Sequence, residues 1–121
     1  MALKASVTSK NDVTIIRLDG KLTLGEGSGL LRETITKAFA DGATRILIDL
    51  GGVSYIDSAG LGELVGCYTS AQNKEVALKL LHLQKRVQGL MQMTRLYLLF
   101  EVFEDESAAI QSFGEGAAAS A

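Results

Sequence analysis

The fold of this chain is decided by one stretch, Val53-Ser54-Tyr55-Ile56-Asp57-Ser58-Ala59-Gly60-Leu61-Gly62, where an apolar strand gives way to a helix. Ser58 stands at the predicted start of that helix, and glycines follow it closely. A hydroxyl there can accept a phosphoryl group beside backbone N–H groups that have no partner within the helix, so added negative charge harms the fold least. The stretch therefore suggests a switch rather than a catalyst.

The residues on either side of this stretch predict a buried strand and an amphipathic helix. Upstream, residues 45–50 form a nearly continuous apolar run that ends at Gly51-Gly52, which is typical of a strand covered on both faces. Such a strand belongs in the middle of a sheet. Downstream, apolar residues at positions i, i+3, i+4 and i+7 mark the buried stripe of a helix, namely Leu61, Leu64, Val65 and Tyr68.

Further from the stretch, strand and helix signals alternate. Alternating residues predict a strand at 3–8 and a β-rich run predicts one at 13–18, and together they form an opening hairpin. Later strands are predicted at 76–81 and 99–103. Apolar residues at helical spacing predict helices at 26–40, 84–93 and 105–113. The order β-β-α-β-α-β-α-β-α predicts a single α/β domain with a mixed β-sheet of about five strands and about four helices. We expect this domain to cover residues 1–113 and residues 114–121 to form a disordered C-terminal tail.

Composition limits the classes of function. The 121 residues are 47% hydrophobic and 21% charged, enough for one domain with one core. A net charge of −2 argues against a nucleic-acid or anionic-membrane surface and favours protein partners. Cys67 is the single cysteine, so it cannot form an internal disulfide, and no long apolar stretch or leader is visible. We expect a soluble cytoplasmic protein with no direct membrane insertion.

One face of the helix after Asp57 is almost bare of side chains. At about 100° per residue, it carries Ser58, Gly62, Gly66, Thr69 and Asn73 in one row. Each glycine within a helix costs about 1 kcal/mol relative to alanine, so something should approach that backbone closely. Either the glycines let the helix sit tightly on its own sheet while Ser58 caps it, or the row docks another protein. The predicted partner-binding residues are Asp57, Ser58, Ala59, Gly60, Gly62, Gly66 and Thr69.

Phosphorylation of Ser58 would act on binding more than on folding. A phosphoryl group brings about −1.5 to −2 charges, which the helix dipole partly stabilises. A partner fitted to a neutral hydroxyl would then face an unpaired charge, which costs several kcal/mol at an interface. A change of about 3 kcal/mol alters affinity more than a hundredfold, enough for an on/off signal.

Other chemistry finds less support in the sequence. A nucleophile elbow needs Gly-x-Ser-x-Gly, but Ile56 stands two residues before Ser58, and a hydrolase would require the single histidine, His82, to reach that serine. One cysteine and one histidine do not assemble a metal cluster, so no metal site is predicted. Gly25, Gly27 and Gly29 lack the Gly-Lys-Ser/Thr of a phosphate loop and fit the entry to the first helix, so no cofactor is predicted.

Most charged residues are expected to lie on faces of the protein that are exposed to solvent. Lys85, Arg86 and Arg95 could in addition flank an acidic patch of a partner.

These motifs resemble those of a known family, the anti-sigma factor antagonists, whose domain is called STAS. The resemblance runs through most of the chain and is carried by Leu18-Asp19-Gly20-Lys21-Leu22, Ile48-Asp49-Leu50, Asp57-Ser58-Ala59-Gly60-Leu61-Gly62 and Phe103-Glu104-Asp105-Glu106-Ser107-Ala108-Ala109-Ile110.

The resemblance implies a bacterial partner-switching protein of transcription regulation that is not itself an enzyme. The unphosphorylated antagonist binds an anti-sigma factor and releases a sigma factor. That anti-sigma factor is an ATP-dependent serine kinase, which phosphorylates the position of Ser58 and so switches binding off. A metal-dependent serine phosphatase resets the switch.

Three positions depart from the common family pattern. Thr23 stands where relatives often have an aspartate, the usual proline before the third helix is missing, and Asn73-Lys74-Glu75 replaces a Gly-Gly turn. They bear on the fit of the cognate kinase and leave Ser58 in place. The alternative functions are a STAS scaffold subunit of a larger signalling or transport complex without phosphate control, and a small hydrolase centred on Ser58.

Overall fold

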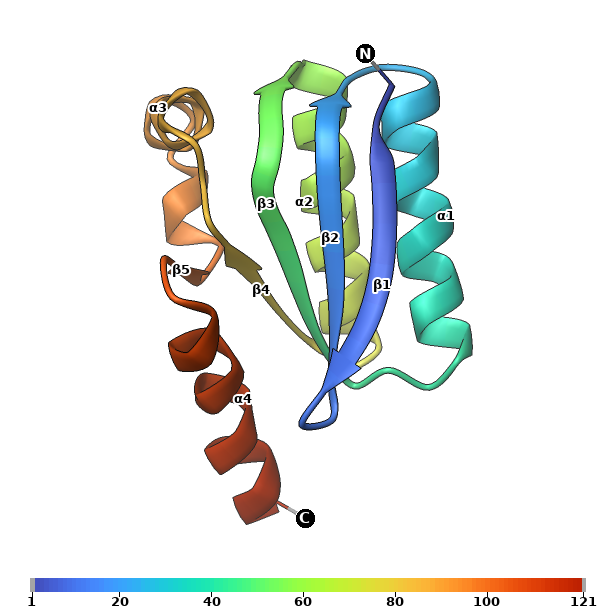
Figure 1. Cartoon of the computed structure of the whole chain (residues 1–121), viewed down its shortest axis with the longest axis vertical. Coiled ribbons are helices and arrows are strands. Elements are labelled where there is room, and N and C mark those ends of the chain that lie inside the picture. Colours follow the sequence, from blue (N-terminus) through green and yellow to red (C-terminus); the bar gives the residue numbers. More distant parts are fainter. Residues whose placement is uncertain (1, 121) are drawn as a thin grey trace.

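The computed structural model describes residues 2–120, and the side chains as far as Gly114. Its elements occur in the predicted order β-β-α-β-α-β-α-β-α (Figure 1), with one short 3-10 turn, η1, added before the last strand. Their bounds are β1 Lys4–Lys10, β2 Val13–Leu22, α1 Glu26–Ala40, β3 Arg45–Ile56, α2 Ser58–Asn73, β4 Ala77–Leu81, α3 Lys85–Met93, η1 Leu96–Leu98, β5 Val102–Phe103 and α4 Glu106–Ser120.

The five strands form one mixed sheet in the order β1-β2-β3-β4-β5. β1 pairs with β2 antiparallel, and the other neighbouring strands pair in parallel. β3 therefore lies in the middle of the sheet, as its apolar run predicts. Ile46, Leu47 and Ile48 are all fully buried because helices cover both faces at this point.

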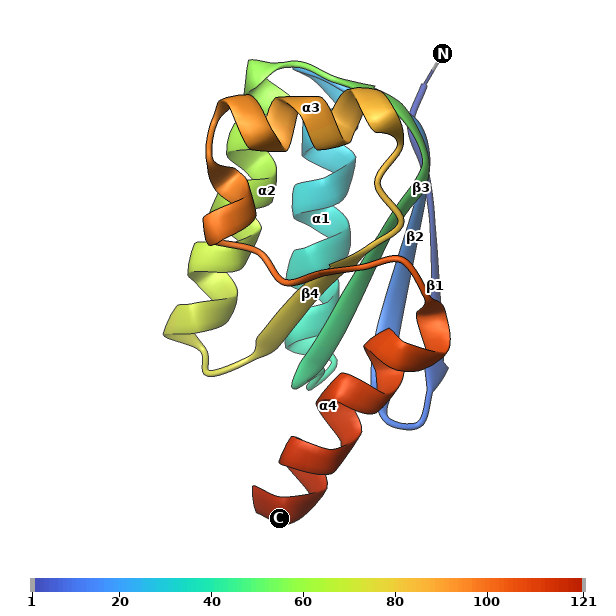
Figure 2. The same cartoon turned by 90° about the vertical axis from the view of Figure 1, so that its left-hand side faces the viewer.

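Two hydrophobic clusters hold these layers together. The larger cluster joins the sheet to α1 and α2, which lie on one face of the sheet (Figure 2), through residues such as Leu31, Ile48 and Leu64. The smaller cluster joins Ile15 and Leu47 to Ile110 and other residues of α4 on the opposite face. Successive residues of β3 point to opposite faces, so Leu47 and Ile48 serve different clusters.

The structure corrects the predicted end of β3. The strand does not stop at Leu50 but runs through Gly51-Gly52 to Ile56. A Cβ atom at Gly52 would lie 2.8 Å from Asp19 Oδ1 and 2.9 Å from the carbonyl oxygen of Leu18. The glycine therefore permits a close approach to β2 at an irregular register and is not a turn signal.

This extension carries the end of β3 past its pairing with β4, while β2 runs beside it as far as Leu22. Arg45 to Asp49 pair with β4, whereas the strand continues to Ile56 beside β2 alone. The start of α2 is therefore carried on a projecting strand end (Figure 1).

The C-terminal part differs from the prediction in length. β5 has only two residues, Val102 and Phe103, where a strand over 99–103 is predicted. Phe100 is instead buried, and its ring lies edge-on to that of Tyr68 with 5.3 Å between the ring centroids. This segment therefore packs its side chain against α2 and does not extend the strand. α4 continues past Phe113 to Ser120. The disordered tail over 114–121 and the 1–113 boundary stay predictions, since side chains beyond Gly114 and all of Ala121 lie outside the described residues.

Candidate functional site

Asp57 organises the turn from β3 into α2. Its Oδ1 accepts a hydrogen bond from the Gly60 amide at 2.8 Å, and its Oδ2 accepts one from the Leu24 amide at 3.0 Å. The bonds from Leu24 and Gly60 hold the pKa of this carboxyl below its usual range. Asp57 is therefore the N-cap of α2, where the sequence had suggested Ser58 as a cap. Both carboxylate oxygens are used to fasten the loop before α1 to the start of α2.

Ser58 is the first residue of α2 and is exposed. Among the described residues, no hydrogen bond of its hydroxyl to another side chain or to the backbone is formed. The hydroxyl thus stands at the N-terminal end of a 16-residue helix and is open to another molecule. An anion at this position would lie at the positive end of the helix dipole.

The glycines after Ser58 fall into two groups. Gly60 is buried, and a Cβ atom there would collide with the carbonyl oxygen of Leu22. Gly62 and Gly66 are exposed, and a Cβ atom at either would meet nothing within 4 Å. Close packing on the protein's own backbone therefore explains Gly60, but it does not explain Gly62 or Gly66.

The predicted row on α2 is accessible along its whole length. Ser58, Gly62, Gly66, Thr69 and Asn73 are all exposed, and we call this row the glycine face. The Thr69 hydroxyl donates to the Val65 carbonyl oxygen at 3.1 Å, which leaves its methyl group as the main feature beside the glycines. Of the other predicted partner-binding residues, Ala59 is half-buried. The glycine face carries few side chains and has Ser58 at one end.

His82 is placed away from Ser58. It follows β4, and its Nδ1 lies 3.1 Å from Asp49 Oδ1. Asp49 precedes the end of β3 at Ile56 by seven residues, so the two ends of that segment are about 20 Å apart at the usual rise per strand residue. Ser58 and His82 therefore do not form the nucleophile and base that a hydrolase would need.

Asp49 belongs to a polar network that sequence reasoning missed. Arg17 Nη1 lies 2.7 Å from Asp49 Oδ2 and 2.8 Å from Glu106 Oε1. Partial burial acts to raise the Asp49 pKa, but hydrogen bonds from the Gly51 amide, His82 and Arg17 outweigh it and lower the pKa. The network ties the first turn of α4 to β2 and β3, so its role is to position that helix.

The structure also places the cysteine and the glycine-rich segment before α1, which the sequence had offered as other candidates for chemistry. Cys67 lies on the buried face of α2, and burial raises the pKa of its thiol to about 12. Gly25, with φ +95°, stands directly before α1, and Gly27 is buried in its first turn, as their interpretation as a helix entry predicts. In residues 2–114, whose side chains the structure describes, no three His, Cys, Asp or Glu side chains gather closely enough to hold a metal ion. Over the same residues no helix has the length and apolarity needed to span a bilayer.

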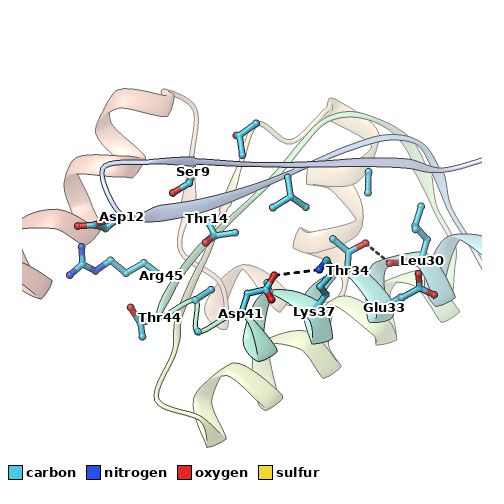
Figure 3. Close-up of a pocket in the computed structure, with 16 residues that line it drawn as sticks. Ser9, Asp12, Thr14, Leu30, Glu33, Thr34, Lys37, Asp41, Thr44 and Arg45 are labelled. Carbon is cyan, nitrogen blue, oxygen red and sulfur yellow. Dashed lines mark hydrogen bonds and ion pairs between the residues drawn. The ribbon is translucent and has the colours of Figure 1, made fainter.

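A hollow of about 730 Å³ lies between the β1–β2 hairpin and α1 (Figure 3). Acidic and basic side chains share its rim, including Glu33 and an ion pair of Lys37 with Asp41 at 3.6 Å. It contains none of the predicted site residues and lies beside the hairpin, not at the end of the sheet that carries Ser58.

Comparison with known proteins places this arrangement in a family. Residues 4–109 match the STAS domain. The chain therefore belongs to the STAS domain family.

Anti-sigma factor antagonists are among the proteins to which it is similar. It is 31% identical over 107 residues to the anti-sigma-B factor antagonist of Staphylococcus aureus (strain NCTC 8325 / PS 47), a match that covers 86% of this chain and 95% of the relative. These findings confirm the resemblance seen in the sequence motifs.

Solved structures show the same fold. The anti-sigma factor antagonist from Mycobacterium paratuberculosis superimposes with a TM-score of 0.82 at 20% identity, covering 92% of this chain and 93% of that one. The Bacillus cell fate determinant SpoIIAA in its phosphorylated form superimposes with a TM-score of 0.69 at 23% identity, covering 92% and 98%.

Proposed function

We propose that this protein is a phosphorylation-controlled anti-sigma factor antagonist of the bacterial cytoplasm. Unphosphorylated, it binds an anti-sigma factor and thereby releases a sigma factor. Phosphorylation of Ser58 ends that binding. The observation that carries the proposal is the exposed Ser58 hydroxyl, which has no hydrogen-bond partner among the described residues and stands at the end of the glycine face.

The named relatives support this proposal. The Staphylococcus aureus relative is an antagonist of the anti-sigma-B factor, and SpoIIAA has been solved in both unphosphorylated and phosphorylated forms. By analogy, the partners here are an anti-sigma factor that acts as an ATP-dependent serine kinase and a metal-dependent serine phosphatase. The protein itself acts by binding and not by catalysis.

The geometry explains how a phosphate could stop binding without unfolding the domain. The phosphoryl group would project from the first turn of α2, where the helix dipole favours negative charge. Asp57, which already holds the turn, keeps both of its hydrogen bonds. A partner fitted to the bare glycine face would meet about two added negative charges and a group larger than a hydroxyl. The phosphoryl group would therefore destabilise the complex with the partner and leave the isolated domain folded.

A phosphorylation assay tests the proposal. The purified protein is incubated with ATP and the anti-sigma factor encoded in the same genome, and intact mass is measured. We expect one phosphate on the wild type and none on Ser58→Ala. Ser54→Ala is the matched control, because Ser54 is also exposed and lies four residues earlier, on β3. Phosphorylation that persists in Ser58→Ala contradicts the assignment.

A titration then tests the switch. Ser58→Asp should leave the thermal midpoint nearly unchanged and weaken anti-sigma factor binding at least tenfold, whereas Ser58→Ala should keep binding. Equal affinities of the two variants would contradict control by charge. Tight binding of a kinase that never modifies the protein would favour the scaffold alternative.

A further inference from the structure

A groove runs from Ser58 along α3. It consists of two adjoining hollows, of about 580 Å³ and about 550 Å³, which share Tyr55, Lys85 and Arg86. The first hollow reaches Ser58 and Met93, and the second reaches Lys21 on β2. We call the two together the α3 groove. Figure 2 shows α3 lying across the end of the sheet next to the start of α2.

The wall of the groove is partly apolar and accessible. Val87 and Met91 are buried and hold α3 on the core, whereas Met93 is 84% exposed and Tyr55 is 40% exposed. Gly89 also lines the groove, and a Cβ atom there would meet nothing within 4 Å. A large exposed methionine beside a bare stretch of helix can fit an apolar side chain from another molecule.

The charge of the groove is opposite in sign to that of the whole chain. Lys21, Lys85 and Arg86 line it, and among the side chains described, as far as Gly114, none of them has a carboxylate oxygen within 4 Å. The Arg86 guanidinium lies 6.0 Å from the centre of the Tyr55 ring. Asp57 is the one carboxylate among the lining residues, and its oxygens already accept from the Leu24 and Gly60 amides. The chain carries a net charge of −2, so this positive groove is a local feature.

We propose that the α3 groove binds a segment of the anti-sigma factor that carries carboxylates next to an apolar side chain. The carboxylates would pair with Lys85 and Arg86, and the apolar side chain would lie against Met93 and Gly89. The inference rests on the proposed function and extends the docking surface from the glycine face around Ser58 to α3. It also deepens the account of the switch, since a phosphoryl group on Ser58 would repel carboxylates seated in the same groove.

Charge reversal in the groove gives the first test. Binding of the wild type and of Lys85→Glu/Arg86→Glu to the anti-sigma factor is measured by calorimetry at low and high salt. We expect the double variant to bind at least tenfold more weakly and to lose most of the salt dependence that the wild type shows. The matched control is Lys4→Glu/Lys10→Glu, which changes the net charge equally on exposed residues of the edge strand β1. The control should keep wild-type affinity.

A second variant tests the apolar wall. Met93→Ser should weaken binding severalfold without lowering the thermal midpoint, because the Met93 side chain makes little contact within the domain. Thermal unfolding of every variant checks that its fold is intact.

The outcomes separate this inference from the function on which it rests. If the wild type binds the anti-sigma factor and is phosphorylated on Ser58, but the charge-reversed groove binds equally well, the α3 groove inference is overturned and the proposed function stands. Equal losses in the groove variant and the β1 control also overturn it, because they would reflect net charge alone. If the wild type neither binds nor is phosphorylated, both are overturned.

Discussion

The glycines of α2 allow a prediction in which one chemical change has opposite effects two residues apart. In Gly62→Ala/Gly66→Ala, each new methyl group enters space with no atom within 4 Å. Alanine is about 1 kcal/mol better than glycine within a helix, so the double variant should be more stable by about 1–2 kcal/mol. In Gly60→Ala, the methyl group collides with the Leu22 carbonyl oxygen, and such overpacking costs about 1–3 kcal/mol or more.

Urea unfolding at equilibrium measures both effects. With a slope of about 1–3 kcal/mol per molar urea, the double variant should unfold at a midpoint higher by roughly 0.5–1 M, and Gly60→Ala at a lower midpoint. The slopes should match that of the wild type, which would show that each variant exposes the same amount of surface on unfolding. Loss of stability in Gly62→Ala/Gly66→Ala would refute the reasoning, because it would mean that these glycines pack inside the domain.

Binding of the same variants tests why the glycines are there. Gly62→Leu should fold and yet lose binding to the anti-sigma factor, because a bulky side chain would stand on the glycine face. The stability that glycine sacrifices at positions 62 and 66 would then have its explanation in docking. Unchanged affinity in Gly62→Leu would remove the glycine face from the docking surface.

Three further predictions concern groups that hold the site and α4. Asp57→Ala should lower the thermal midpoint at pH 7. The Leu24 and Gly60 amides lower the Asp57 pKa from its ordinary 3.8, so the stability that this carboxylate contributes is fully present above pH 3.8 and is lost as pH falls through the lowered pKa. The thermal midpoints of the variant and the wild type should therefore converge in acid. Glu106→Gln should cost roughly 0.5 kcal/mol by weakening the half-buried pair with Arg17. Because Arg17 lowers the Glu106 pKa from its ordinary 4.5, this effect should fade as pH falls below that value, and a difference that persists at pH 2 would contradict the reasoning. The Cys67 thiol, buried and with a pKa of about 12, should react with a disulfide reagent at pH 8 only as fast as the domain opens, so urea should accelerate the reaction; rapid labelling in native buffer would show that the thiol is accessible.

Much of the fold is predictable because its signals are local. The first helix is predicted at residues 26–40 and observed at Glu26–Ala40, since apolar spacing defines its buried face and Asp41-Gly42 ends it. Gly42 indeed has φ +89°, a conformation that glycine adopts without strain. The continuous apolar run at residues 45–50 likewise predicts that β3 is buried on both faces.

The sequence-based prediction fails where a residue typical of a turn is instead needed for a contact with a distant part of the chain. Gly51-Gly52 is typical of a turn in the sequence, but in the structure Gly52 makes room for β2. Gly60 lies about 200° from Gly62 on a helical wheel, so spacing alone puts the two glycines on different faces of α2. The sequence does not show that a Cβ atom at Gly60 would collide with the carbonyl oxygen of Leu22, because that contact is tertiary.

The place of Ser58 in the fold could be predicted from the sequence, and the surroundings of the candidate site could not. Ser58 at a helix start follows from the change of period at Asp57, and an exposed row follows from residue spacing. The α3 groove depends on where α3 crosses the projecting end of β3, which no local pattern records. Lys85 and Arg86 are ordinary surface cations in the sequence, and they become a candidate docking feature only beside Ser58.

The β1–β2 hairpin has a practical use for anyone handling this domain. Its two-residue tip, Asn11-Asp12, has positive φ at both positions and lies at the opposite end of the sheet from the start of α2 (Figure 1). A fluorophore, a biotin for a sensor chip or an inserted epitope placed there would leave Ser58 and α3 unobstructed. Immobilised in that orientation, every molecule would offer the same end to whatever protein flows past.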